Sequence, residues 1–393
     1  MSEPIRVLVV DDSSVVRGIL QTFLESDPAI RVVGAARNGQ EALTLAKQLH
    51  PNVITMDVRM PVMDGLTTTE HLMAYQPTPI LVVSSTLNNP DVDIAFQMLA
   101  AGALDVIETP PLNSPDERAA YRTMLIRRVK LLAGMRVVTH LRGRRTGRGG
   151  PSTAGTPPLP TSPPPITALA PPSLYSERIA PPMPPPSSLT SASTPPFPII
   201  VIGASAGGPR IVQYILKQLP ATLPAAVLLV QHIADGFTAG MADWLNGHTD
   251  LRVQVATDRL PLQTSTVLVA ADGYDILVSP EWQVTLRREG YQAGRPRPSV
   301  DVAMQSVAQV FGSHTIGVIL SGMGNDGAQG MRDIHAQGGY TLAQNEATCP
   351  IFGMPRAAIE LGVVDQVLPP EGIVAAILHR LPRLSRESAR VRP

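Results

Sequence analysis

Three aspartates stand beside apolar runs near the start of the chain. Asp11 and Asp12 follow the run IRVLVV, and Asp57 ends the run NVITMD. Three carboxylates with no thiol or imidazole among them suit a hard cation such as Mg²⁺, which takes oxygen ligands and leaves positions open for phosphate oxygens. Asp11 or Asp12 alone could equally cap the helix that follows it. Together the three predict a cation site that is open to phosphate.

A serine, a histidine and an aspartate form a second set, late in the chain. Ser205 is at the apex of the small-residue turn GASAGG, His232 follows the apolar run AAVLLV, and Asp326 lies in a glycine-rich turn after TIGVIL. Taken singly, each has a plainer role, as a phosphate-binding turn, a structural histidine and a turn former. Together they supply the nucleophile, general base and orienting acid of a serine hydrolase.

Two other chemistries fit the second set less well. A dinucleotide-binding turn of the form G-x-G-x-x-G needs glycine where Ser205 stands. The chain order Ser, His, Asp also differs from the order Ser, acid, His of α/β-hydrolases, which indicates a different hydrolase scaffold. Cys349, the single cysteine, is an alternative nucleophile, but no histidine is adjacent to it in the sequence.

Parallel sheets would bring each set together, because the carboxyl ends of parallel strands share one edge of a sheet. In the first part of the chain, continuous apolar runs alternate with amphipathic stretches, which predicts a five-stranded βα alternation. In the later part, the strand at 197–202, the turn and a helix at 211–219 predict a second α/β unit. The first unit has strands expected at 5–10, 31–36, 52–57, 79–85 and 104–107, with helices expected at 15–24, 41–49, 92–101 and 119–132.

A proline-rich stretch separates the two units. Seventeen of the residues 151–198 are proline, mixed with Ser, Thr and Ala, and such a composition cannot bury a core. A basic stretch, 136–148, precedes it. We therefore predict a first domain at 1–135, a flexible linker at 136–197, a second domain at 198–382 and a C-terminal tail at 383–393.

Composition limits the partners and the compartment. The chain has 393 residues with 32 basic and 32 acidic ones, so no overall charge draws it to nucleic acid or a membrane surface. The basic stretch lacks the interleaved aromatic residues of a nucleic-acid site. No apolar run reaches the ~18 residues of a membrane span, and one cysteine allows no intramolecular disulfide. We expect a cytoplasmic protein with no membrane insertion.

The first unit resembles the receiver domain of two-component response regulators, through VVDDSSVVR and MDVRMPVMDG. The resemblance implies that Asp57 accepts a phosphoryl group from a histidine kinase of the CheA type. It also implies that Asp11 or Asp12, Asp57 and the backbone carbonyl of Arg59 hold Mg²⁺, and that Ser84 follows the phosphoryl group. The family has a lysine where this chain has Thr109, and that lysine would contact the phosphoryl oxygens.

The second unit resembles the methylesterase domain of the CheB family, chemotaxis response regulators that are protein-glutamate methylesterases. The matching segments are VIGASAGGP, LLVQHIADGFT, RPSVDVAMQSVA, GVILSGMGNDGAQGM and AQNEATCPIFGMPRAAI. The resemblance implies two doubly wound parallel-sheet domains, a flavodoxin-like receiver and a Rossmann-like methylesterase domain. It makes Ser205, His232 and Asp326 the catalytic triad, with Ala206 and the turn containing Met323 forming the oxyanion hole.

By the same resemblance, the substrates are glutamate γ-methyl esters on the cytoplasmic helices of chemoreceptors, with deamidation of receptor glutamines as a second activity. The esterase reaction needs no cofactor. Two positions depart from the family pattern, since Ala206 replaces a threonine and Asp275 replaces a histidine. The change at Asp275 leads us to expect altered substrate contacts.

Three other functions remain open from the sequence. A non-enzymatic scaffold would keep the first unit and carry the second as a relic, which the complete triad argues against. A DNA-binding regulator would need a helix-turn-helix or basic output domain after the linker, and none is found. A constitutive esterase without phosphorylation control is the fourth hypothesis, and Thr109 motivates it.

Overall fold

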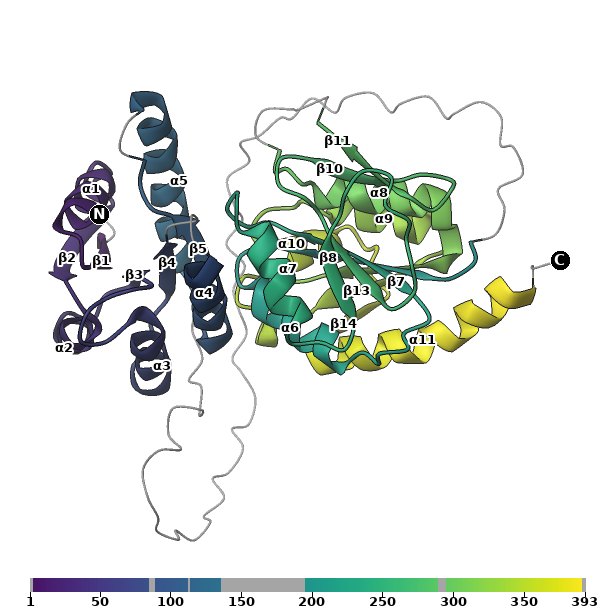
Figure 1. Ribbon diagram of the computed structural model, residues 1–393, viewed down its shortest axis with the longest axis horizontal. Helices are drawn as coiled ribbons and strands as arrows, with labels where there is room; N and C mark the ends of the chain where they lie inside the picture. The colour runs from purple at the N-terminus through teal and green to yellow at the C-terminus, as the bar shows by residue number, and fades with distance from the viewer. Residues whose placement is uncertain (1–2, 85–88, 112–113, 136–194, 289–294, 391–393) are drawn as a thin grey trace, which may run out of the picture.

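The computed structural model describes residues 3–84, 89–111, 114–135, 195–288 and 295–390, in two α/β domains (Figure 1). The predicted linker, 136–197, lies almost entirely outside the described residues. Both predicted parallel sheets are present, which confirms the expected fold class. Among the described residues, no helix has the length and apolar character needed to cross a membrane.

The first domain is a five-stranded sheet in the order β2-β1-β3-β4-β5, with every pair parallel. Apolar residues fill its central strands because helices cover both faces, α1 and α5 on one and α2, α3 and α4 on the other. The strands are β1 (Ile5–Val10), β2 (Ile30–Ala36), β3 (Val53–Asp57), β4 (Ile80–Ser84) and β5 (Asp105–Glu108), and the helices are α1 (Ser14–Glu25), α2 (Gly39–Leu49), α3 (Gly65–Tyr75), α4 (Asn89–Ala101) and α5 (Pro115–Ala133).

Side-chain caps start several of these helices. Asn38, Asp64 and Ser114 each accept a hydrogen bond from the backbone N–H three residues later, at the starts of α2, α3 and α5. Ser13 does the same for α1. The apolar runs did not predict α3, because its exposed face and its threonines at 67–69 leave only a weak amphipathic pattern.

The second domain is a seven-stranded parallel sheet in the order β14-β13-β12-β6-β7-β9-β8. Its strands are β6 (Ile199–Ala204), β7 (Ala226–Gln231), β8 (Arg252–Val255), β9 (Thr266–Val269), β12 (Thr315–Ile319), β13 (Tyr340–Gln344) and β14 (Gln366–Leu368). The first of them in the chain, β6, lies in the middle, with β7 on one side and β12 on the other. The strand order therefore reverses at β6, and ligands of such sheets bind at the carboxyl ends beside a reversal of this kind.

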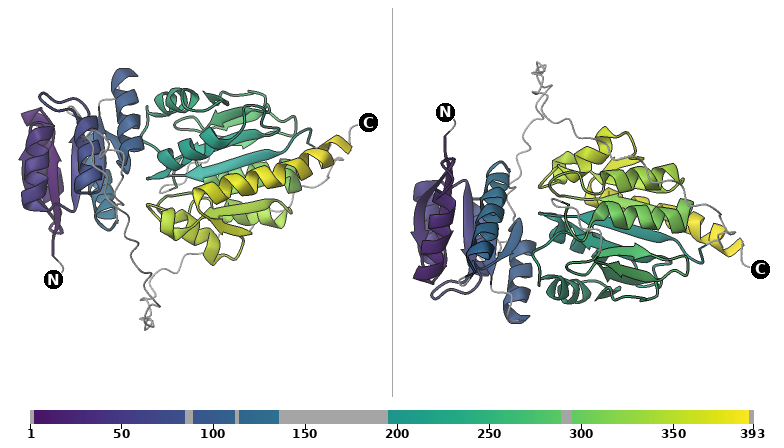
Figure 2. Two further views of the ribbon diagram at one scale, coloured as in Figure 1. Left: turned by 90° about the horizontal axis from the view of Figure 1, so that it is seen from below. Right: turned by 90° about the horizontal axis from the view of Figure 1, so that it is seen from above.

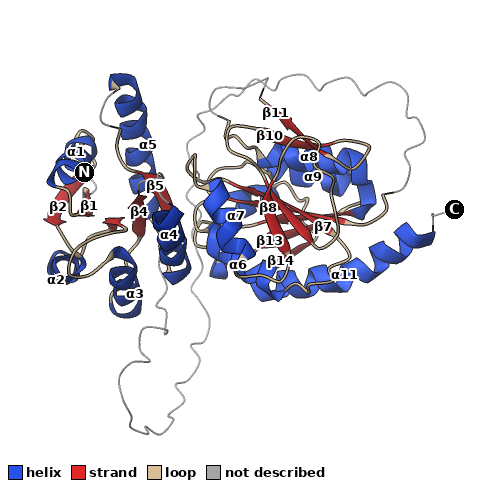
Figure 3. Cartoon of the chain, viewed as in Figure 1, coloured by secondary structure: helices blue, strands red, loops and turns tan. Residues whose placement is uncertain are grey.

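Helices cover both faces of this sheet (Figure 2). On one face are α6 (Gly208–Gln218), α7 (Thr238–Asn246) and α11 (Pro370–Arg390). On the other are α8 (Val300–Phe311), α9 (Ala328–Ala336) and α10 (Met354–Glu360), together with an antiparallel hairpin of β10 (Asp275–Val278) and β11 (Val284–Arg287). Figure 3 shows the strands of each sheet between their helices.

The C-terminal tail predicted from residue 383 is wrong as a boundary, since α11 continues to Arg390. Pro382 lies inside this helix, where its missing N–H would normally end one. Leu381 and Leu384 on either side of it are 1% exposed and pack into the core. Burial of these two side chains carries the helix past the proline.

The two domains are in direct contact through α4 of the first and α7 of the second. The Phe96 and Trp244 rings stack with their centroids 5.3 Å apart. Gly240 on α7 lies so close to Val92 on α4 that an added Cβ would stand 2.0 Å from Val92 Cγ1. Apolar residues of both domains consequently form one continuous cluster.

Candidate active site and acidic cluster

The structure brings Asp11, Asp12 and Asp57 together at the carboxyl ends of β1 and β3. Carboxylate oxygens of all three lie within 4.8 Å of one another. Asp11 accepts a 2.8 Å hydrogen bond from the Ser13 N–H, and Asp57 accepts one of 2.7 Å from the Val58 N–H. Asp12 is exposed, so the cluster is open to solvent on one side. Its donor set, carboxylate oxygens alone, fits a hard divalent cation.

The carboxylates of this cluster destabilise one another's charge. Burial, with the neighbouring charges of Asp11 and Asp12, raises the pKa of Asp57 to about 7. Burial and the charge of Asp12 raise the pKa of Asp11 to about 6. A bound cation would remove this repulsion, because an opposite charge favours the ionised carboxylates.

The other first-domain candidates lie around the same edge. Ser84 ends β4, is fully buried and pairs with Glu108 of β5. Thr109 donates its backbone N–H to the Ser84 carbonyl at 3.0 Å. Arg59, two residues after Asp57, turns its guanidinium to Asp91 on α4 in an ion pair. Thr109 thus lies next to Ser84 in the sheet, but it brings no positive charge there.

In the second domain, Ser205 and His232 directly follow two adjacent strands, β6 and β7, that end in register. Ala204 of β6 pairs with Gln231 of β7, and the two candidates are the next residues along. The His232 N–H donates to the Ala204 carbonyl at 2.9 Å, and the Ser205 N–H donates to the Ser321 carbonyl, also at 2.9 Å. Ser205 therefore stands at the strand-order reversal, between the ends of β7 and β12.

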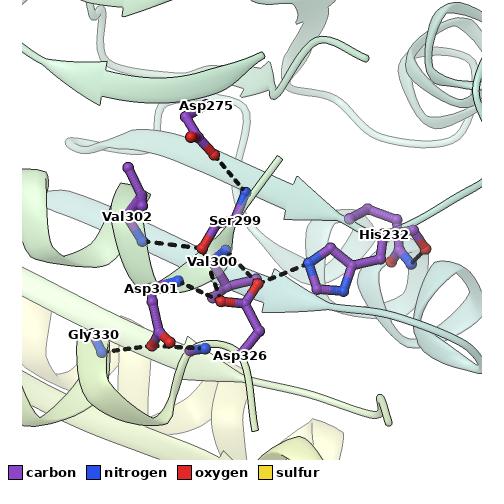
Figure 4. Close-up of polar contacts among 10 residues, drawn as sticks. His232, Asp275, Ser299, Val300, Asp301, Val302, Asp326 and Gly330 are labelled. Carbon is purple, nitrogen blue, oxygen red and sulfur yellow. Dashed lines mark hydrogen bonds and ion pairs between the residues drawn. The ribbon is translucent and has the colours of Figure 1, made fainter. Parts of the chain in front are cut away.

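Asp326 is bonded directly to His232. Its Oδ2 lies 2.9 Å from His232 Nε2, and the aspartate is 8% exposed (Figure 4). Burial opposes ionisation, yet the hydrogen bond and charge of His232 and the N–H groups of Val300 and Asp301 hold the pKa of Asp326 below its usual value. Asp326 therefore fixes the ring through Nε2, which leaves Nδ1 as the nitrogen that can act as a base.

The proposed oxyanion-hole residues flank Ser205. Gly322 is packed against it, and a Cβ added at Gly322 would lie 2.7 Å from Ser205 Cβ. The next residue is Met323. Within the described ranges, the N–H groups of Ala206 and Met323 have no hydrogen-bond acceptor, so both can serve an incoming oxygen.

Gln231 is a site residue that the sequence analysis did not predict. Its Nε2 donates to the carbonyls of Ser205, at 2.7 Å, and of His232, at 2.9 Å. It thereby ties the turn that carries the serine to the strand end that carries the histidine. The available signal was a polar residue closing an otherwise apolar strand.

Asp275 does not face the site. It is completely buried, and its carboxylate accepts hydrogen bonds from Arg295, Arg297 and the Ser299 N–H. Complete burial and these hydrogen bonds place Asp275 in the framework of the domain, and the altered substrate contacts stay a prediction.

Cys349 is not an activated nucleophile. Burial raises the pKa of its thiol to about 11, and its Sγ donates to the Ile351 carbonyl at 3.1 Å. The thiolate, the reactive form, is therefore scarce at neutral pH.

The first domain reaches the turn that carries Ser205. The Gly207 N–H, two residues after the serine, donates to the Leu104 carbonyl of the first domain at 2.7 Å. A cleft of about 1020 Å³ lies between the domains, lined by Leu104 and Met135 on one side and by Arg210, Met323 and Phe352 on the other. The edge that carries the serine is thus partly covered.

These features define a class: response regulators in which a receiver domain is joined to a second α/β domain. The family model "Response regulator receiver domain" matches residues 7–113, and "CheB methylesterase" matches residues 200–377. The chain belongs to the family of protein-glutamate methylesterase/protein-glutamine glutaminases.

Two curated relatives match over nearly their full length. The protein-glutamate methylesterase/protein-glutamine glutaminase 2 of Anaeromyxobacter dehalogenans is 38% identical over 95% of this chain and 96% of its own. The protein-glutamate methylesterase/protein-glutamine glutaminase of Symbiobacterium thermophilum is 37% identical over 96% of this chain and 97% of its own length. Among solved structures, the CheB methylesterase catalytic domain of Thermotoga maritima has 34% identity and a TM-score of 0.45, covering 47% of this chain and 98% of its own.

Proposed function

We propose that this chain hydrolyses glutamate γ-methyl esters on the cytoplasmic helices of methyl-accepting chemoreceptors, releasing methanol, and deamidates receptor glutamines to glutamate. The observation that carries the proposal is the bond from His232 to Asp326 beside Ser205, at the strand-order reversal. The names of the full-length relatives support the substrate class. The reaction takes place in the cytoplasm, where those receptor helices lie.

Ser205, His232 and Asp326 act as the catalytic triad. His232 Nδ1 takes the Ser205 hydroxyl proton as Oγ attacks the ester carbonyl, and it returns the proton to the leaving methanol. Water then attacks the acyl-enzyme by the same route and releases glutamate. Asp326 stabilises the imidazolium through Nε2. With a glutamine substrate, the leaving group is ammonia.

Ala206 and Met323 supply the oxyanion hole through their backbone N–H groups. A negative oxygen develops when the carbonyl becomes tetrahedral, and preorganised donors stabilise it; removing one such donor costs about 10²–10³ in rate. The change from the family's threonine to Ala206 leaves this role intact, because the backbone N–H remains.

The receiver controls the esterase through Asp57. A histidine kinase of the CheA type donates a phosphoryl group to its carboxylate. Mg²⁺ would neutralise the phosphoryl oxygens, held by Asp11, Asp12, Asp57 and the Arg59 carbonyl. Ser84 then turns toward the phosphoryl group, and the change reaches β5, to which it is paired.

Phosphorylation opens the active-site edge. In the closed arrangement, Leu104, the residue before β5, holds the serine turn through Gly207, and α4 contacts α7. Phosphorylation shifts the population away from this arrangement. The rival is a constitutive esterase, favoured by Thr109, which leaves the phosphoryl group without the usual ammonium partner.

One experiment separates these functions. Methanol release from methyl-labelled receptor membranes is measured with the intact chain, with and without a small phosphodonor, alongside Ser205→Ala and Asp57→Ala. We expect release that the donor stimulates, loss of all release in Ser205→Ala, and loss of the stimulation in Asp57→Ala. Release that needs Ser205 but ignores the donor would establish the constitutive esterase instead. No release from wild type would reject the proposed substrate.

A further inference from the structure

Asp326 accepts hydrogen bonds from other groups besides His232. Its carboxylate accepts a 2.9 Å bond from Ser299 Oγ, a 2.7 Å bond from the Val300 N–H and a 3.1 Å bond from the Asp301 N–H. All three donors belong to the N-terminal end of α8. The carboxylate of Asp326, which lies just before α9, thus caps the neighbouring helix (Figure 4).

Asp301 makes the reciprocal interaction with the start of α9. It lies in the first turn of α8, and its Oδ1 accepts bonds from the Gly327 N–H and the Gly330 N–H, both at 2.8 Å. Gly327 is the residue after Asp326, and Gly330 is in the first turn of α9. Each of the two helices therefore has its N-terminal end satisfied by an aspartate attached to the other.

Close packing leaves this arrangement little freedom. A Cβ added at Gly330 would lie 2.4 Å from Met304 Cβ and 3.2 Å from the Asp301 backbone. The helices meet at this glycine, so the backbone of Asp301 is held against the first turn of α9.

We propose that Asp301 is a positioning residue for the triad, whose carboxylate fixes the turn that carries Asp326 and thereby aims Asp326 at His232. The inference rests on the proposed esterase function for its kinetic test. Among the residues that the structure describes, the carboxylate of Asp301 accepts from Gly327 and Gly330 and makes no hydrogen bond to Ser205 or His232, so it acts through Asp326.

The charges around Asp301 are few. Asp326 faces it from the loop before α9, and burial together with that charge raises the pKa of Asp301 to about 6. From β10, Asp275 approaches the start of α8 with its partners Arg295 and Arg297. His232 faces the far side of Asp326. Asp326 is therefore the group whose orientation Asp301 can change.

Three variants of the full chain test the proposal. Asp301→Ala removes the acceptor oxygen. Asp301→Asn keeps an oxygen for Gly327 and Gly330 but no charge. Asp333→Asn is the matched control, since Asp333 is a half-buried aspartate one turn further along α9, with its pKa also raised by burial.

Two readouts are taken from each variant. The first is the downfield proton resonance of the His232 Nε2–H, assigned by its loss in His232→Gln, which reports the bond to Asp326 without any substrate. The second is kcat and KM for methanol release from methylated receptor membranes. We expect Asp301→Ala to lose the resonance and about 10² in kcat at unchanged KM, as misplacement of a catalytic group does. Asp301→Asn and Asp333→Asn should keep both.

Several results would overturn the proposal. The first is an unchanged resonance and kcat in Asp301→Ala. The second is a loss of resonance and kcat in Asp301→Asn or in Asp333→Asn that is as large as the loss in Asp301→Ala. Should Asp301→Ala not fold, Asp301→Asn still decides, because loss of its resonance contradicts a role based on the acceptor oxygen. If wild type releases no methanol, the proposed esterase function is contradicted, and the resonance alone then tests the positioning role of Asp301.

Discussion

Asp57 ends β3 and Asp326 lies in the loop between β12 and α9, and their surroundings shift the two pKa values in opposite directions. Burial and two neighbouring carboxylates raise the pKa of Asp57. Asp326 is also buried, but His232 and backbone N–H groups hold its pKa down. The residue types and their strand-end positions were evident from the sequence. The donors around each carboxylate, which decide its chemistry, come from segments far apart in the chain.

The structural role of Asp275 could not be predicted from its departure from the family pattern alone. Its role depends on two arginines about twenty residues later and on complete burial. Because both guanidiniums would lose the charge of the buried carboxylate that they share, we expect Asp275→Asn to lower the free energy of unfolding by about 3 kcal/mol. Denaturant unfolding measures this value.

The matched control for Asp275 is Glu346→Gln, which breaks the exposed pair with Arg356 at 3.4 Å. A surface pair of this kind contributes about 0–1 kcal/mol, so little change is expected. Equal losses in the two variants would contradict the assignment of Asp275 to the buried framework.

Asp301 makes stability depend on pH. Its pKa is about 6 in the folded chain, against 3.8 for an unperturbed aspartate. Between these pH values the folded state keeps a proton that the unfolded state has released, so this group favours folding at low pH and loses that effect as pH rises through 6. We expect the Tm of wild type, relative to Asp301→Asn, to fall between pH 4 and 6.5 and to level off above. Calorimetry at matched ionic strength measures it, and a constant difference would refute the shift.

At the scale of elements, the apolar runs predicted the strands of the first domain and β6, β7 and β12 of the second to within about two residues. These runs are informative because parallel strands are buried on both faces. The hairpin β10–β11 and the passage of α11 through Pro382 were not predicted, since tertiary packing determines both. The turn after β6 was predicted from its small residues, and its geometry explains them.

Gly207 shows why that turn needs glycine. Its φ is +74°, and a Cβ there would lie 2.8 Å from Pro350 Cβ and from Ser321 Oγ. We expect Gly207→Ala to lower stability by about 2 kcal/mol, of which about 1 kcal/mol is the positive φ alone. It should also lower kcat, because the turn carries Ser205. Denaturant unfolding and methanol release give the two values.

Gly362→Ala is the comparison for Gly207→Ala. Its φ is +69°, but nothing lies within 4 Å of the added Cβ. It should show only the φ penalty, about 1 kcal/mol, and normal kcat. If the two variants were indistinguishable in kcat, the turn would not position the serine.

At the scale of the whole molecule, the contact between the domains was beyond sequence reasoning. Phe96 and Trp244 resemble ordinary core residues, and nothing in their local patterns distinguishes an interface between domains from a core. The predicted linker separates the two halves in the chain, so neither its length nor its composition specifies which surfaces meet. The interface matters because it reaches the serine turn through Leu104 and Gly207.

Gly240 allows the interface to be opened without removing a side chain from either core. An added Cβ would stand 2.0 Å from Val92 Cγ1, while alanine favours the helical conformation of α7 by about 1 kcal/mol over glycine. We expect Gly240→Ala to raise methanol release without phosphodonor several-fold and to reduce the further stimulation by the donor. Gly18→Ala in α1, where nothing lies within 4 Å, should change neither. Adding Val92→Ala to Gly240→Ala should restore the low basal rate by removing the clash. A basal rate that stays at the wild-type value in Gly240→Ala would mean that this contact does not restrain the esterase.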